Sequence, residues 1–250
     1  MLNLSSKKVI TNTSLSCLFG ALLCANSALA AQSFSSEQQQ EIEKIVHKYI
    51  VSHPEVLVEA AKALENKHAQ SQQASLLEVV DFFINDKNTP ARGLRTAKHY
   101  VVEFFDYNCG YCKVVRPLTK RLQEKNDVVI YYVELPILSP LSVKASAIGL
   151  ALYQKDAQKY FKYQDELMKT NVKISSEDQI KDAVSIAGGN YKELNEVVQN
   201  NSKIQEILRK NMELSQKIGV QGTPFFIIDG QVVRGAVKDY DTFESLLKKD

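Results

Sequence analysis

Two cysteines separated by two residues are the side chains of this sequence best suited to chemistry. They form the run Cys109-Gly-Tyr-Cys112, which follows an apolar, β-prone stretch at 100–105 and precedes a helical pattern. A Cys-x-x-Cys pair between a strand and a helix is typical of a redox-active dithiol. The pattern therefore predicts thiol–disulfide exchange.

The two cysteines are expected to differ in role. Cys109 stands at the predicted helix N-terminus, where unpaired backbone N–H groups stabilise a thiolate and lower its pKa. We therefore expect Cys109 to be the exposed, attacking thiol. Cys112 lies one turn further along, and we expect it to be the shielded thiol that resolves a mixed disulfide.

The first 30 residues (1–30) predict a secretory signal peptide. Lys7 and Lys8 form a basic start, an apolar stretch covers 15–29, and an Ala-Leu-Ala run ends at Ala30. Small residues at these last positions are what a signal peptidase reads, so we expect cleavage near Ala30.

Two alternatives for this segment are weaker. A membrane anchor needs roughly 20 apolar residues, and this stretch is shorter. A lipoprotein attached through Cys24 would normally have a small residue before that cysteine, where this chain has Leu23.

Removal of the segment leaves a single cysteine pair. Cys17 and Cys24, two of the four cysteines, lie within it. A pair that closes so short a loop adds little stability, even in an oxidising compartment, so a catalytic role is favoured. A zinc or copper site would need two further ligands. We therefore predict no metal and no cofactor.

The composition is that of an ordinary globular protein. The chain has 250 residues, of which 44% are hydrophobic and 24% charged, enough for one sizeable core and a smaller appendage. Its 31 basic and 29 acidic side chains nearly balance. This balance argues against nucleic acid as a partner.

Residues 31–88 predict a separate all-α arm. Apolar residues recur at helical spacing, as at Ile42, Ile45, Val46 and Tyr49. The arm either folds back on the main domain or meets the arm of another copy. We favour the second interpretation, a homodimer or homotrimer formed through 31–88.

Residues 89–250 predict an α/β domain. The strand before the dithiol is followed by a helix, a second strand at 127–135, a large helical insertion at about 142–218, a hairpin turning at Asp229-Gly230, and a last helix.

A second motif, Gly222-Thr223-Pro224, directly precedes an apolar strand. An X-Pro bond in such a turn is a candidate for the cis isomer. A loop of this kind leaves backbone groups free to pair with an extended peptide.

Together these features resemble the DsbA-like branch of the thioredoxin superfamily, which implies a thioredoxin-like fold. The resemblance rests on Glu103-Phe-Phe-Asp-Tyr-Asn-Cys109-Gly-Tyr-Cys112, Pro117, the helical insertion and Thr223-Pro224, and it runs from about residue 98 to the end of the chain. The arm resembles that of the oligomeric members, the ScsC (suppressor of copper sensitivity) type and the Com outer-membrane antigen type.

The resemblance implies a role for each matching residue. Cys109 would attack and Cys112 would resolve, Pro224 would face the disulfide as a cis-proline, and Thr223 would tune contact with the client. Glu103 would be a buried acid that moves protons to and from Cys112, for which a raised pKa is suitable. The alternative for Glu103 is an ordinary strand residue that reaches solvent or a lysine.

The residues between the cysteines depart from the strongly oxidising members, which carry Pro-His there. Gly110-Tyr111, together with Thr223, resembles the DsbC-type isomerases and would contact the client. A less stabilised thiolate makes a less oxidising couple, so oxidase and isomerase both stay open.

The sequence thus predicts an exported thiol:disulfide oxidoreductase of the periplasm, with outer-membrane association as an option. It would form or isomerise disulfide bonds in secreted proteins. Its partners would be unfolded or misbridged secreted proteins and a membrane redox protein that resets the dithiol. The rival interpretation is a structural or chaperone-like, surface-associated oligomer with an incidental dithiol.

Overall fold

The computed structural model describes residues 34–237 and 239–248, so the predicted signal peptide lies outside the described residues. Contacts divide the chain into two compact units, with the boundary between Lys62 and Ala63. This boundary lies inside a helix and not at residue 88, where the sequence pattern placed it. No helix among the described residues is both long and apolar enough to cross a membrane.

The first unit holds helix α1, Ser36–Ser52, and the start of helix α2, Glu55–Asn85. Ser35 caps α1: its hydroxyl accepts the Gln38 N–H at 3.3 Å, and the Gln38 side chain accepts the Ser35 N–H at 2.9 Å. No residue of α1 is buried. Its apolar side chains and those of early α2 are exposed, among them Ile42, Ile45, Val46, Tyr49, Leu57 and Val58.

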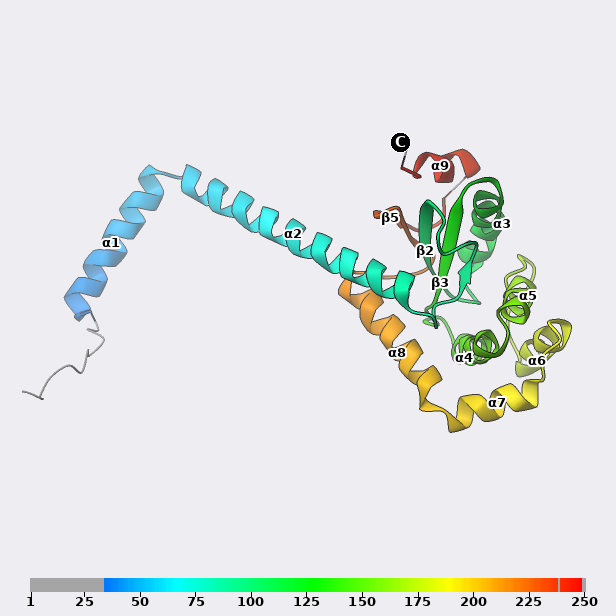
Figure 1. Ribbon diagram of the computed structural model, residues 1–250. Helices are drawn as coiled ribbons and strands as arrows, with labels where there is room; N and C mark the ends of the chain where they lie inside the picture. The colour runs from blue at the N-terminus through cyan, green and yellow to red at the C-terminus, as the bar shows by residue number, and fades with distance from the viewer. Residues whose placement is uncertain (1–33, 238, 249–250) are drawn as a thin grey trace, which may run out of the picture. The chain divides into compact units, whose positions relative to one another are not determined.

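The second unit is built on a five-stranded sheet of order β1-β3-β2-β4-β5 (Figure 1). The strands are β1 Ala91–Arg92, β2 His99–Phe105, β3 Val128–Glu134, β4 Phe225–Ile228 and β5 Gln231–Arg234. Strand β2 is central, parallel to β3 and antiparallel to β4. Its burial on both faces agrees with the continuous apolarity that predicted it.

Alternate residues of β2 enter two different cores. Val101 and Phe105 face the core that contains both cysteines. Val102 and Phe104 face a second core that receives the end of α2, through Leu76, Val79, Val80 and Phe83. The second half of α2 is therefore part of the core of the second unit, because its apolar residues cover one face of the sheet.

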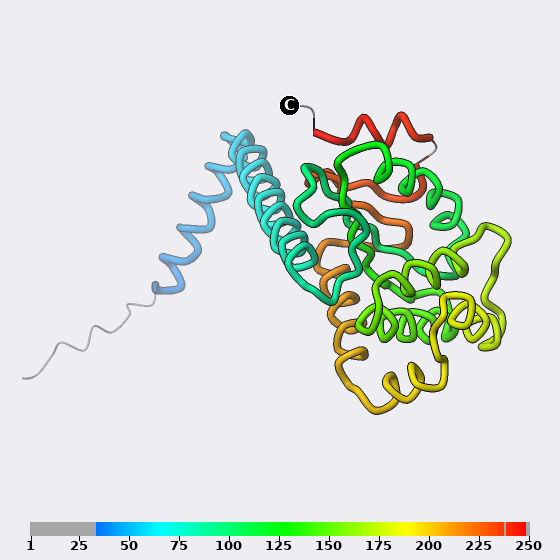
Figure 2. The backbone as a smooth tube through the Cα atoms, turned by 45° about the vertical axis from the view of Figure 1, so that its right-hand side comes forward, coloured from blue at the N-terminus to red at the C-terminus, as the bar shows by residue number. Residues whose placement is uncertain are grey.

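Five helices separate β3 from β4, as the predicted insertion requires. They are α4 Pro140–Lys155, α5 Ala157–Leu167, α6 Glu177–Ile186, α7 Tyr191–Asn200 and α8 Ser202–Lys217, and they form a continuous run of helices from green to orange in Figure 2. Helices α3, Gly110–Lys125, and α9, Tyr240–Ser245, pack together. Asp229 and Gly230 have φ of 47° and 87°, which confirms the tight hairpin turn between β4 and β5.

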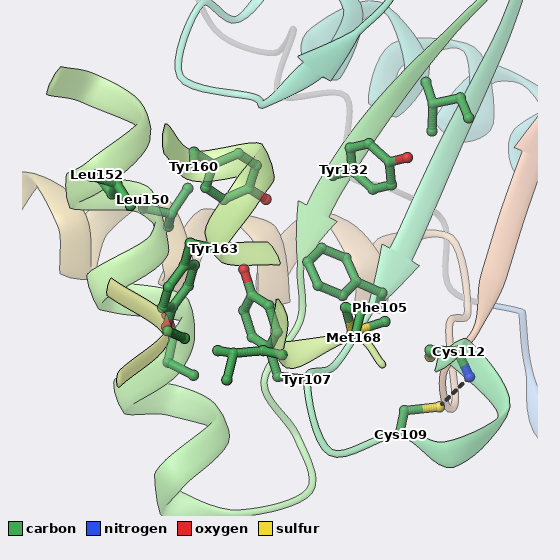
Figure 3. Close-up of a cluster of buried hydrophobic side chains, with 14 of the residues drawn as sticks. Phe105, Tyr107, Cys109, Cys112, Tyr132, Leu150, Leu152, Tyr160, Tyr163 and Met168 are labelled. Carbon is green, nitrogen blue, oxygen red and sulfur yellow. Dashed lines mark hydrogen bonds between the residues drawn. The ribbon is translucent and has the colours of Figure 1, made fainter. Parts of the chain in front are cut away.

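A buried carboxylate joins the insertion to the sheet. Glu134, at the end of β3, accepts hydrogen bonds from the hydroxyls of Tyr107 at 2.9 Å, Tyr160 at 2.9 Å and Ser146 at 2.8 Å. Figure 3 shows the two tyrosines among the aromatic side chains of this core. Burial raises the pKa of Glu134 to about 8. The hydroxyls satisfy a group that would otherwise be costly to bury.

The docking of α2 on the sheet is testable with Phe83, which is fully buried and packs edge-to-face on Phe104 with ring centroids 5.5 Å apart. We expect Phe83→Ala to lower the free energy of unfolding by about 3–5 kcal/mol. Leu77→Ala, an exposed position of the same helix, should change it by less than about 0.5 kcal/mol. Urea denaturation at equal protein concentration measures both. Equal denaturation midpoints would contradict the packing.

Candidate functional site

The dithiol lies where β2 passes into α3. Cys109 is the N-cap of α3, and its Sγ accepts the backbone N–H of Cys112 at 3.1 Å, the contact drawn in Figure 3. Cys109 is only 4% exposed and Cys112 is fully buried. The expectation of an exposed Cys109 is therefore wrong: the sulfur is turned toward its own helix and a neighbouring loop.

That loop contains the second predicted motif. The Thr223–Pro224 peptide bond is cis, as the sequence predicted. The carbonyl oxygen of Thr223 accepts a hydrogen bond from the Cys109 thiol at 3.3 Å. The Pro224 carbonyl is paired with the N–H of Gly235 at 2.9 Å. The fold thus brings together two motifs that are far apart in the chain.

The pKa values of the two thiols are shifted in opposite directions. Hydrogen bonding from the Cys112 side chain, with a further hydrogen bond from the Cys112 backbone, lowers the pKa of Cys109 from 9.0 to about 6, against the raising effect of burial. Burial raises the pKa of Cys112, and the neighbouring Cys109 raises it further. Near neutral pH the arrangement holds one thiolate, on Cys109, beside one thiol. A stabilised thiolate favours the reduced form and makes the disulfide a stronger oxidant.

A buried aspartate shapes the turn that carries Cys109. Asp106 accepts the N–H of Asn108 at 2.7 Å, the hydroxyl of Ser142 at 2.7 Å and the N–H of Leu138 at 3.0 Å. The sequence analysis missed this residue. Aspartate two residues before a backbone donor is a common turn signal, but its other two partners come from distant positions.

Asn108 and Lys113 tie the same turn to the helical insertion. The Asn108 amide donates to Ser139 Oγ at 3.0 Å and accepts the N–H of Ile174 at 2.9 Å. Lys113 Nζ donates to the carbonyl of Val172 at 2.5 Å, and burial lowers its pKa. The insertion therefore holds both sides of the dithiol.

Glu103 lies on the central strand β2, between Val101 and Phe105, on the face of the sheet that packs against the core containing both cysteines. It is fully buried, and it pairs in register with Tyr132 of β3 and Phe226 of β4. Neither carboxylate oxygen has a hydrogen-bond partner in the part of the chain that the structure describes. Burial raises the pKa of Glu103 to about 7, against the lowering influence of Arg116. The side chain does not reach solvent, as it would if Glu103 were an ordinary exposed strand residue.

The residues between the cysteines face outward. Tyr111 is 71% exposed, and a side chain added at Gly110 would meet open space. Exposed apolar side chains occur at Val114, one turn after Gly110, and at Leu138, whose N–H is bound by Asp106. An extended polypeptide has room to approach the dithiol from this side.

Comparison with known proteins matches two family models to this chain. A DsbA-like thioredoxin domain covers residues 100–248, and the N-terminal domain of the copper resistance protein ScsC covers residues 38–71. A relative, the probable disulfide bond formation protein D of Bacillus anthracis, is 26% identical over 161 residues, which is 60% of this chain and 72% of the relative.

Solved structures agree with these matches. Proteus mirabilis ScsC in a transitional conformation is 33% identical with a TM-score of 0.63, covering 86% of this chain and 95% of that one. The thiol-disulfide exchange protein α-DsbA2 of Wolbachia pipientis is 27% identical with a TM-score of 0.64, covering 72% and 95%. The thioredoxin-like fold with its helical insertion and helical N-terminal arm is therefore confirmed.

The lowered pKa of Cys109 sets a pH dependence. In the reduced protein, alkylation of Cys109 by iodoacetamide should rise about tenfold per pH unit below the pKa and level off above it, with a midpoint near 6. Because the folded pKa lies below the ordinary 9.0, the reduced fold should gain stability as pH rises from about 6 to 9 and lose it as pH falls through 6. Cys109→Ser is the control that isolates Cys112. A midpoint near 9 would contradict the geometry.

Proposed function

Because this chain belongs to the DsbA-like thioredoxin family, we propose that it is an exported thiol:disulfide oxidoreductase that forms or isomerises disulfide bonds in secreted proteins through Cys109 and Cys112. The observation that carries the proposal is the Cys109 sulfur, which accepts a backbone N–H at its helix N-terminus and lies 3.3 Å from the Thr223 carbonyl. The donated N–H favours a thiolate, and the Thr223 contact places the sulfur beside a loop suited to an extended client.

Oxidation of a client proceeds by two exchanges. A client thiolate attacks the Cys109 sulfur of the Cys109–Cys112 disulfide, that bond breaks, and Cys112 leaves and takes up a proton. A second client thiolate then attacks the client sulfur of the mixed disulfide. A client disulfide forms, and Cys109 leaves as a thiolate, which its lowered pKa makes a good leaving group.

Isomerisation begins from the reduced protein. The Cys109 thiolate attacks a client disulfide, which breaks, and a mixed disulfide forms. A client thiolate can then attack the client sulfur of the mixed disulfide and release Cys109. Alternatively, Cys112 attacks the Cys109 sulfur and releases the client as a thiolate. The lowered pKa of Cys109 supports the oxidase direction, whereas Gly110-Tyr111 and Thr223 resemble isomerases. Trapping free thiols in cell extracts with an alkylating mass tag separates the two, because an oxidase is kept as a disulfide and an isomerase is kept reduced.

We place the protein in the periplasm, exported by the segment 1–30 and reset by a membrane redox protein. The exposed apolar faces of α1 and early α2 support homo-oligomerisation, and so does the match of this region to the N-terminal domain of ScsC. Several active sites in one assembly would let one client engage more than one dithiol. The proposed oligomerisation arm is residues 31–88, although residues from Ala63 onward also belong to the second compact unit.

Cysteine variants test the activity. Cys109→Ser should reduce catalysed insulin reduction to the uncatalysed rate, because it removes the attacking sulfur. Cys112→Ala should instead accumulate mixed disulfides with clients, visible as adducts on non-reducing gels. A structural or holdase oligomer with an incidental dithiol predicts that both variants behave like the parent, so unchanged activity and missing adducts would reject the enzyme.

Charges placed on the apolar face of α1 test the arm. Ile45→Glu with Tyr49→Glu should convert the oligomer to a monomer by light scattering, because both side chains are exposed in the single chain and would be buried between copies. Gln40→Glu with His47→Glu adds the same charge on the opposite side of the helix and should leave the mass unchanged. A mass that stays constant in both pairs would refute oligomerisation through α1.

A further inference from the structure

Two buried groups of opposite charge lie on the two elements that carry the dithiol. Glu103 on β2 is 0% exposed and Arg116 on α3 is 7% exposed. Both carboxylate oxygens of Glu103, and Nε and Nη1 of Arg116, have no hydrogen-bond partner within residues 34–237 and 239–248. Buried charges without partners are costly, so this pair calls for an explanation beyond packing.

Tyr132 brings the two groups to the same place. It pairs with Glu103 across the parallel strands, so both side chains project from one face of the sheet. The Arg116 guanidinium lies over the Tyr132 ring, with Cζ 4.7 Å from the ring centroid. Arg116 is four residues after Cys112, and both are buried residues of α3. Four residues is one helical turn, so Cys112 and Arg116 share a helix face.

The far end of the guanidinium is firmly held. Arg116 Nη2 donates to Gln164 Oε1 at 2.5 Å and to Asp165 Oδ1 at 2.8 Å. Arg92 also pairs with Asp165, at 3.0 Å. These contacts come from α5 and β1, so the cation cannot swing out to solvent without breaking them. Its other nitrogens are left without a neutralising hydrogen bond.

We propose that Arg116 is a positioning residue for the thiol–disulfide exchange: held over Tyr132 by Gln164 and Asp165, it keeps the carboxylate of Glu103, on the cysteine-facing side of the sheet, available as the acceptor of the Cys112 proton. The inference rests on the proposed function and adds a residue to it. Arginine stays charged under all relevant conditions, so Arg116 itself exchanges no proton.

When a client is bound to Cys109 as a mixed disulfide, the Glu103 carboxylate accepts the proton of the Cys112 thiol. The Cys112 thiolate attacks the Cys109 sulfur, the Cys109–Cys112 bond forms, the bond to the client breaks, and the client leaves as a thiolate. In the reverse direction Cys112 leaves as a thiolate and receives the proton from Glu103.

Electrostatics support this geometry. Burial raises the pKa of Glu103, and the strongest opposing influence is Arg116 on α3. Cys109 also raises the pKa of Glu103, and Arg92 on β1 lowers it; Asp165 on α5 pairs with both arginines. Removal of Arg116 therefore moves the pKa upward and takes away the carboxylate at neutral pH. A nearby opposite charge commonly lowers a carboxyl pKa by about 1–3 units.

The test is the titration of Glu103 in the reduced, full mature chain, followed by NMR of ¹³C-labelled glutamate carboxyl groups and assigned with Glu103→Gln. Arg116→Met should raise the midpoint by at least one unit, about tenfold in proton affinity. Arg116→Lys, which restores the charge, should bring it back to within about half a unit. Arg121→Met, an exposed position of the same helix, is the matched control and should leave it unchanged.

A second variant tests the opposite direction. Asp165→Asn keeps an acceptor oxygen for Arg116 but removes the negative charge paired with it, so the cation should act more strongly and the Glu103 midpoint should fall, even if Arg116→Met does not fold. The pH profile for resolution of a mixed disulfide should follow each shift, and Glu103→Gln should abolish the effect of Arg116→Met. Midpoints that stay constant in Arg116→Met and Asp165→Asn, with only stability lost, would overturn the inference. Shifted midpoints in a protein without thiol exchange would instead reject the proposed function.

Discussion

The thiolate of Cys109 is the constraint on which the rest of the site depends. A negative sulfur in a nearly buried position needs donors, and the start of α3 supplies one through the Cys112 N–H. Cys112, one turn further along the same helix, is buried. One short turn therefore makes Cys109 a good leaving group and Cys112 a poor one. The side chains of Asp106 and Asn108 hold that turn in place, because they accept hydrogen bonds from the loop before α4 and the loop before α6.

The helical insertion is bonded both to the sheet and to the turn that carries the dithiol. Glu134 joins β3 to α4 and α5 through three hydroxyl donors, and Lys113 and Asn108 extend the connection to the loop between α5 and α6. Burial of so many polar groups makes the local dielectric low, and each charge near the dithiol acts strongly there. This explains why Glu103 and Arg116, which share no hydrogen bond, still influence one another.

The two compact units follow different physical rules. The second hides its apolar side chains in two cores on opposite faces of one sheet. The first leaves an apolar face of α1 exposed. Helix α2 serves both units: its early residues belong to the first, and Val79 and Phe83 complete a core of the second.

Local patterns in the sequence were enough to predict the dithiol between β2 and α3, the Asp229-Gly230 hairpin, the cis bond at Pro224 and the insertion, because each depends on neighbouring residues. Position in three dimensions decided the rest. The sequence implied a buried Glu103 only through family resemblance, and it gave no sign of Arg116, Asp106 or Glu134, whose partners lie tens of residues away. It also predicted an exposed Cys109, since a helix N-terminus says nothing of the loop that covers it. Burial, which raises the pKa of Cys112 and of Glu103, arises only when distant segments pack together.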